Sequence, residues 1–174
     1  FSGKMSYYSE YSFRDGETFY DRSKALGEIN DSKNLTFRNS IVGPDMNENG
    51  IGLFNWFMKQ HGEIKGFDGV KWTGVTTLTL AKAMEVAINN NLTGIYNLVN
   101  NQTITKYEML NFFNALFKRQ VIVIRTNDFN ISKILVNNRQ NEFQFIVPSY
   151  EQMFFEMYEW VNSHKELYKH YFDK

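Results

Sequence analysis

The stretch LTFRNSIV at residues 35–42 constrains the fold of this chain more than any other part of the sequence. Its apolar and β-branched residues predict a strand, and Gly43 and Pro44 predict where that strand ends. A strand of this kind in a parallel sheet needs neighbouring strands and cover on both faces. The stretch therefore requires other segments of polypeptide around it.

Helices and strands are predicted on both sides of this stretch. The clearest is a helix over residues 76–89, in which Leu78, Ala81, Met84 and Ile88 form one apolar stripe. The other predicted helices cover residues 17–29, 51–61, 106–118 and a long segment that begins at Pro148, and the other predicted strands cover residues 62–67, 94–99 and 121–124.

The composition indicates a folded domain without a strongly charged partner. The chain has 174 residues, of which 43% are hydrophobic and 17% aromatic, enough for a substantial core. Its formal net charge of zero gives no reason to expect nucleic acid or an anionic membrane as a partner. The lack of cysteine excludes disulfides, and His61, His164 and His170 do not have the spacing of a metal site. No apolar run approaches about 20 residues, and the first residues lack a signal-peptide layout, so a cytoplasmic protein is expected.

Tyr20 and Lys24 are the first candidates for chemistry. They lie four residues apart in the helix predicted at residues 17–29, so both side chains point from one face. A fixed cation beside a phenol favours its phenolate form, which suits a tyrosine that moves a proton onto or off a sugar hydroxyl. The same pair is also compatible with an exposed tyrosine beside a solvated lysine.

The surroundings of this pair carry a family resemblance. The segment YDRSKALGEI at residues 20–29, followed by LTFRNSIVGP at residues 35–44, resembles the catalytic helix and the following strand of the extended short-chain dehydrogenase/reductase family. Within that family it is similar to the sugar-nucleotide group of reductases and epimerases. The segments SKALGE and WTGVTT resemble the dehydrorhamnose reductases more than the dehydratases. Further similar segments follow in the same order: FSGK, GLFNWFMKQHGEIKGF, WTGVTTLTLAKAM and LTGIYNLVNNQTITKYEMLNFF.

The resemblance implies the C-terminal part of a Rossmann-like doubly wound parallel sheet, with a small α/β substrate-binding portion. No glycine-rich turn between a strand and a helix occurs in the chain, although a dinucleotide pyrophosphate needs one. We therefore expect the chain to lack the dinucleotide-binding half. The expected divisions are residues 1–45 for the catalytic helix and core strand, 46–75 for a substrate-binding segment, 76–100 for a return helix and core strand, and 101–174 for the C-terminal substrate-binding portion.

The resemblance also implies the site residues. Tyr20 and Lys24 are the expected catalytic residues, and together with Asn39 they are expected to contact NAD(P)H. The expected substrate-binding residues are Asn39, Ser40, Phe54, Trp72 and Arg139. A surface arginine is the alternative for Arg139, and a structural ion pair is the favoured role of Arg38. The polar loop at residues 1–16 contains Tyr7, Tyr8 and Tyr11, which either line a substrate pocket or lie on the surface.

The function implied is NAD(P)-dependent reduction or epimerisation of a nucleotide-linked keto-deoxysugar. A second hypothesis is a non-catalytic module that binds a sugar nucleotide or serves in assembly, because a cofactor is not held without its phosphate-binding turn. Strands that lack their neighbours would expose apolar faces and free edges, so a homodimer is also possible.

Overall fold

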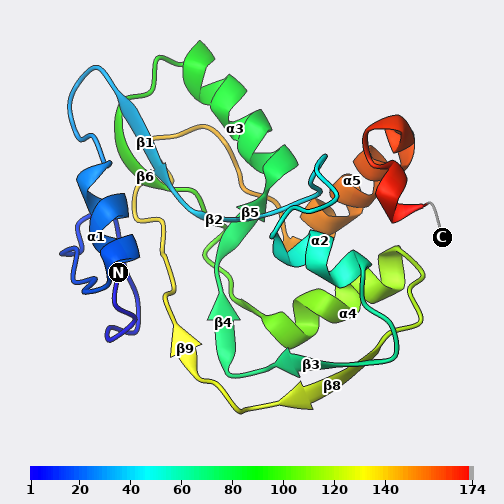
Figure 1. The fold of residues 1–174 in the computed structure, drawn as a ribbon. Coiled ribbons are helices and arrows are strands. Elements are labelled where there is room, and N and C mark those ends of the chain that lie inside the picture. Colours follow the sequence, from blue (N-terminus) through cyan, green and yellow to red (C-terminus); the bar gives the residue numbers. More distant parts are fainter. Residues whose placement is uncertain (173–174) are drawn as a thin grey trace.

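The computed structural model describes residues 1–172 and has a mixed α/β fold with parallel strand pairs (Figure 1), which confirms the predicted fold class. Its α-helices are α1 (Phe19–Leu26), α2 (Leu53–Met58), α3 (Thr77–Asn89), α4 (Lys106–Leu116) and α5 (Tyr150–Ser163). Its strands are β1 (Leu35–Arg38), β2 (Ser40–Val42), β3 (Glu63–Phe67), β4 (Val70–Trp72), β5 (Gly74–Thr76), β6 (Gly94–Asn97), β7 (Ile104–Thr105), β8 (Ile122–Thr126) and β9 (Ile131–Ser132). Two short 3-10 turns, Lys165–Leu167 and Lys169–Tyr171, follow α5.

The single strand predicted at residues 35–42 is two strands in the structure. β1 pairs in parallel with β6, and β2 pairs in parallel with β5. Asn39 separates them and lies at the point where the chain changes from one neighbouring strand to the other. The stretch is divided because its two halves pair with different strands: β2 with β5, which precedes α3, and β1 with β6, which follows α3. In open parallel sheets, ligands bind outside the carboxyl ends of the strands.

α1 is shorter than the helix predicted at residues 17–29. The Thr18 side chain caps its first turn by accepting a hydrogen bond from the Asp21 backbone N–H at 3.1 Å, and Gly27 ends the helix. The residues after Gly27 lead into β1 without helical structure, so the predicted helix end at residue 29 is corrected. Tyr20 and Lys24 both remain inside α1.

α3 has the predicted position but buries a different face. Its buried residues are Thr79, Ala83 and Ala87, which are small and allow close packing. Met84 and Ile88, from the predicted apolar stripe, are 50% and 73% exposed. The apolar stripe of α3 is therefore turned away from the core of the described residues.

Aromatic side chains from α2, α4 and α5 form the core. Phe54 is fully buried, with its ring 5.2 Å from that of Phe113 and 5.4 Å from that of Tyr171. Phe57 is also fully buried, whereas Trp56 is 41% exposed. Since Trp56 is offset by 100° from its neighbours along the helix, one face of α2 reaches the core and the other does not. The remaining large buried side chains include Phe154, Met109, Met153 and Met157.

Tyr171 makes stability sensitive to alkaline pH. Burial raises its pKa to about 12, and its hydroxyl accepts from the Asp45 backbone N–H at 2.9 Å. The folded state holds this proton more tightly than the unfolded state, where the pKa is about 10. Stability contributed in this way is present below about pH 10 and falls by up to about 2 kcal/mol as pH rises through about 12. The free energy of unfolding in urea, measured from about pH 10 to about pH 12, should fall less steeply for the Tyr171→Phe variant than for the wild type. Equal slopes for the two proteins would contradict this role of Tyr171.

Candidate active site

A cavity of about 690 Å³ lies beside α1, the β1–β2 connection and the start of α3. Tyr20 and Lys24 line it from α1, and Leu80 lines it from α3. Asn39 lines it from the connection between β1 and β2, and Ser40 from the start of β2. The structure thus brings four of the predicted site residues to one concave surface. Parallel pairing puts the carboxyl end of β1 at this cavity, where a ligand is expected in folds of this class.

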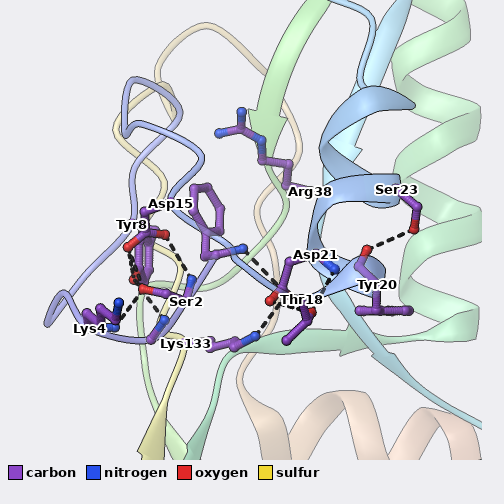
Figure 2. A network of polar contacts seen from close by, with 12 residues as sticks. Ser2, Lys4, Tyr8, Asp15, Thr18, Tyr20, Asp21, Ser23, Arg38 and Lys133 are labelled. Carbon is purple, nitrogen blue, oxygen red and sulfur yellow. Dashed lines mark hydrogen bonds and ion pairs between the residues drawn. The ribbon is translucent and has the colours of Figure 1, made fainter.

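Tyr20 and Lys24 share one face of α1, as their spacing predicts. The Lys24 ammonium lies 5.6 Å from the centre of the Tyr20 ring, and the Tyr20 side chain is 68% exposed. The Ser23 hydroxyl donates to the Tyr20 backbone carbonyl at 2.9 Å (Figure 2) and not to the Tyr20 phenol oxygen. The Tyr20 hydroxyl is therefore accessible to a molecule in the cavity, with a cation one turn away.

A buried carboxylate holds the beginning of α1. Asp21 is 8% exposed and accepts hydrogen bonds from the Thr18 hydroxyl at 2.7 Å and the Lys133 ammonium at 3.0 Å, as Figure 2 shows. These two hydrogen bonds, from Thr18 first and then Lys133, keep the pKa of Asp21 below its usual range. Because Asp21 follows Tyr20 directly, this contact restricts the rotation of α1 that would carry Tyr20 away from the cavity.

A bidentate ion pair holds the other end of α1 against β1. Arg38 donates from Nε to Glu28 Oε1 at 2.8 Å and from Nη2 to Glu28 Oε2 at 2.7 Å, and Arg14 reaches the same carboxylate. Burial would raise the pKa of Glu28, but the hydrogen bonds from Arg38 and Arg14 outweigh it and lower the pKa. The predicted role of Arg38 as a structural ion-pair partner is confirmed.

The loop at residues 1–16 is ordered around Tyr8. Tyr8 is fully buried, and its hydroxyl donates to Asp15 at 3.0 Å and accepts from the Gly3 backbone N–H at 2.9 Å. Asp15 also accepts from the Ser2 side chain and backbone, and these bonds lower its pKa to about 2. Tyr7 and the other loop tyrosine, at position 11, are exposed and do not line the cavity.

Three predicted substrate contacts lie elsewhere. Phe54 is in the aromatic core, and the Trp72 ring packs 5.8 Å from the Tyr150 ring. Arg139 stacks 4.0 Å from the Tyr96 ring and pairs with Glu142. None of the three lines the cavity. An aromatic or cationic side chain that packs within the chain has the same sequence signature as one that meets a ligand.

Other cavity residues were not predicted. Arg14, Asp21, Glu28 and Lys133 all line it. Asp21 has the sequence signature of a favourable charge near a helix N-terminus, which says nothing of its contact with Lys133, 112 positions away. A single sequence contains no signal for that pairing.

No group of three or more His, Cys, Asp or Glu side chains among residues 1–172 has the arrangement of a metal site. Within the same residues, no helix combines the length and the apolar character needed to cross a membrane.

No protein-family model matches the sequence, and no curated protein matches it. Solved structures do match the fold. The dTDP-4-dehydrorhamnose reductase of Bacillus anthracis in complex with NADP superposes with a TM-score of 0.74 at 18% identity, over 92% of this chain and 62% of that one. The orthologue of that reductase from Clostridium acetobutylicum gives 0.73 at 17% identity, over 93% and 62%. The dTDP-glucose 4,6-dehydratase of Bacillus anthracis in complex with NAD gives 0.67 at 16% identity, over 97% and 59%.

The agreement covers nearly all of this chain but less than two thirds of each matching enzyme. At these identities the likeness concerns the fold. The comparisons therefore support the fold expected from the sequence: over most of its length, the chain has the Rossmann-like α/β fold of the sugar-nucleotide reductases and the dehydratase that it matches.

Proposed function

We propose that this chain supplies the proton-transfer residues and the substrate side of an NAD(P)-dependent enzyme that reduces a nucleotide-linked keto-deoxysugar. The observation that carries the proposal is the meeting of Tyr20, Lys24, Asn39 and Ser40 at one cavity beside the end of a parallel strand. A phenol and an ammonium on one helix face suit proton transfer to a carbonyl oxygen. The fold of the matching reductases agrees with this reaction class.

The residues of the cavity fit the nicotinamide end of a dinucleotide. Lys24 supplies an ammonium and Tyr20 a hydroxyl, and the buried Asn39 Nδ2 has no hydrogen-bond partner among residues 1–172. A buried amide donor without a partner is uncommon in a folded chain, which makes Asn39 a candidate ligand contact. The pyrophosphate would need a glycine-rich turn at a helix N-terminus, which the sequence lacks.

Tyr20 would supply the one proton that reduction of the keto group requires. NAD(P)H, when bound, supplies the hydride. The Tyr20 hydroxyl gives its proton to the keto oxygen as the carbonyl carbon gains that hydride, so C=O becomes CH–OH and Tyr20 is left as phenolate. The Lys24 ammonium stabilises this phenolate, and a proton from water then restores the phenol. Ser40, which lines the same cavity beside Asn39, is the proposed contact to the sugar.

A second candidate is a non-catalytic module that binds a sugar nucleotide. It is favoured by the lack of a glycine-rich turn and by the open surroundings of Tyr20, which is 68% exposed. A binding module would need the cavity but not the proton donor.

Turnover of dTDP-4-dehydrorhamnose by the natively expressed protein tests the proposal. We expect NADPH consumption that depends on the sugar nucleotide, and an increase in NADPH fluorescence on binding. The isolated 174-residue chain should show neither, because it has no phosphate-binding turn. Sugar-nucleotide binding by the native protein without NADPH binding would favour the binding module and contradict the reductase.

A further inference from the structure

The segment that follows β9 is fixed on both of its sides. The Leu135 N–H donates to the hydroxyl of the buried Thr73 at 2.9 Å. On the other side, the Tyr8 N–H donates to Ile134 O at 2.8 Å, and the Val136 N–H donates to Tyr8 O at 2.9 Å. Since Tyr8, Ile134 and Leu135 are also buried, this segment has little freedom to move.

Lys133 projects from this fixed segment towards α1. Its ammonium donates to Asp21 Oδ1 at 3.0 Å, and Figure 2 shows the side chain extended towards that carboxylate. Gly3 confines the stem of Lys133, because a Cβ atom at Gly3 would lie 3.3 Å from Lys133 Cγ. Gly3 has a φ of +86°, which glycine adopts without strain, so the loop can pass this close. Lys133 therefore joins a fixed part of the chain to the helix that carries Tyr20.

Polar contacts, and not apolar packing, hold α1 in the part of the chain that the structure describes. Asp21 is the one buried residue of this helix, whereas Phe19 and Leu26 are 90% and 88% exposed. The ion pair made by Arg38 lies beyond the other end of the helix. The orientation of Tyr20 at the cavity is therefore set by its neighbour Asp21.

We propose that Lys133 is a positioning residue for the proton donor of the cavity: it holds Asp21, and Asp21 sets the orientation of Tyr20. The inference rests on the proposed function. Lys133 also lines the cavity, but a buried carboxylate binds its ammonium, so the geometry favours an action through α1 over a direct contact with the substrate. A displacement of about 1 Å between reacting groups costs up to about a hundredfold in rate, so loss of this contact should lower kcat.

Turnover of dTDP-4-dehydrorhamnose by variants of the natively expressed protein tests this role. We expect Lys133→Met to lower kcat about ten- to hundredfold and to change KM less than about twofold, because the substrate contacts remain. Lys133→Arg should recover most of the loss, since a guanidinium also donates to a carboxylate. Lys82→Met is the matched control and should keep full activity: Lys82 pairs with Glu156 at 2.7 Å, its side chain is 49% exposed against 44% for Lys133, and it does not line the cavity.

Asp21→Asn tests the same contact from the side of the helix. The asparagine oxygen still accepts from the Thr18 hydroxyl, so this variant removes mainly the ion pair with Lys133. Its loss in kcat should equal that of Lys133→Met, and the double variant should lose no more than either single variant. If one single variant fails to fold, the other still tests the contact.

Hydrogen exchange gives a readout that does not depend on activity. The backbone amides of α1 should exchange at least about threefold faster in Lys133→Met than in the wild type. A lower kcat with unchanged exchange would mean that Lys133 contacts the substrate itself, and it would overturn the proposal, as would an unchanged kcat or additive losses in the double variant. If the wild type shows no turnover, faster exchange would retain the hold of Lys133 on α1 and reject only the proposed function, whereas unchanged exchange would reject both.

Discussion

The Tyr20→Phe variant should lose about a hundred- to ten-thousandfold in kcat for reduction of dTDP-4-dehydrorhamnose, with little change in KM. The change removes one hydroxyl from a side chain that is 68% exposed, so the fold has little reason to respond. The effect follows from the loss of the proton that the keto oxygen receives as its carbon gains hydride. NADPH oxidation by the natively expressed protein, compared at saturating substrate, measures the loss.

Lys24→Met separates the role of the cation from that of the phenol. Lys24 lies 5.6 Å from the Tyr20 ring, so its removal takes away the charge that stabilises the phenolate. We expect a loss of about a hundredfold in kcat.

Tyr158→Phe is the matched control for the hydroxyl deletion, because the Tyr158 ring packs against Phe117 and does not line the cavity. Full activity of Tyr20→Phe, or an equal loss in Tyr158→Phe, would remove Tyr20 from the mechanism.

The sequence was sufficient for those parts of the site that lie close together in the chain. Tyr20 and Lys24 share a face because a helix repeats every 3.6 residues, and Asn39 lies within the stretch at residues 35–42 whose end is marked by Gly43 and Pro44. These relations need only local geometry. The Asp21–Lys133 contact joins positions 112 apart, so it depends on how the whole chain packs.

Two further differences arose from ambiguous apolar patterns. Phe54 has the same character whether a helix places it over a nucleotide or in a core, and its neighbours Phe113 and Tyr171 were needed to decide. On α3, small residues rather than Met84 and Ile88 face the core, because Ala83 and Ala87 allow the helix to pack closely. An apolar stripe predicts a buried contact but does not identify the surface that provides it.

The Glu28→Gln variant should lose about 3 kcal/mol in the free energy of unfolding. Arg38, with a side chain only 7% exposed, would then keep its charge without a carboxylate partner. Its remaining acceptors are backbone carbonyls, including Glu10 O at 3.2 Å, so the expected loss is at the lower end of the range for a broken buried pair. Urea unfolding at neutral pH measures it, and the lowered pKa of Glu28 predicts that the difference from wild type shrinks as acid protonates this carboxylate.

The double variant Glu28→Gln with Arg38→Met distinguishes the ion pair from a general effect of substitution. If the pair holds α1 against β1, the double variant should lose clearly less stability than the two single variants added together, because no buried charge remains. Asp128→Asn is the control, since the Lys65–Asp128 pair is exposed and should contribute less than about 1 kcal/mol. Additive losses would mean that Glu28 and Arg38 act separately, and the position of Tyr20 at the cavity would then depend on the Asp21–Lys133 contact alone.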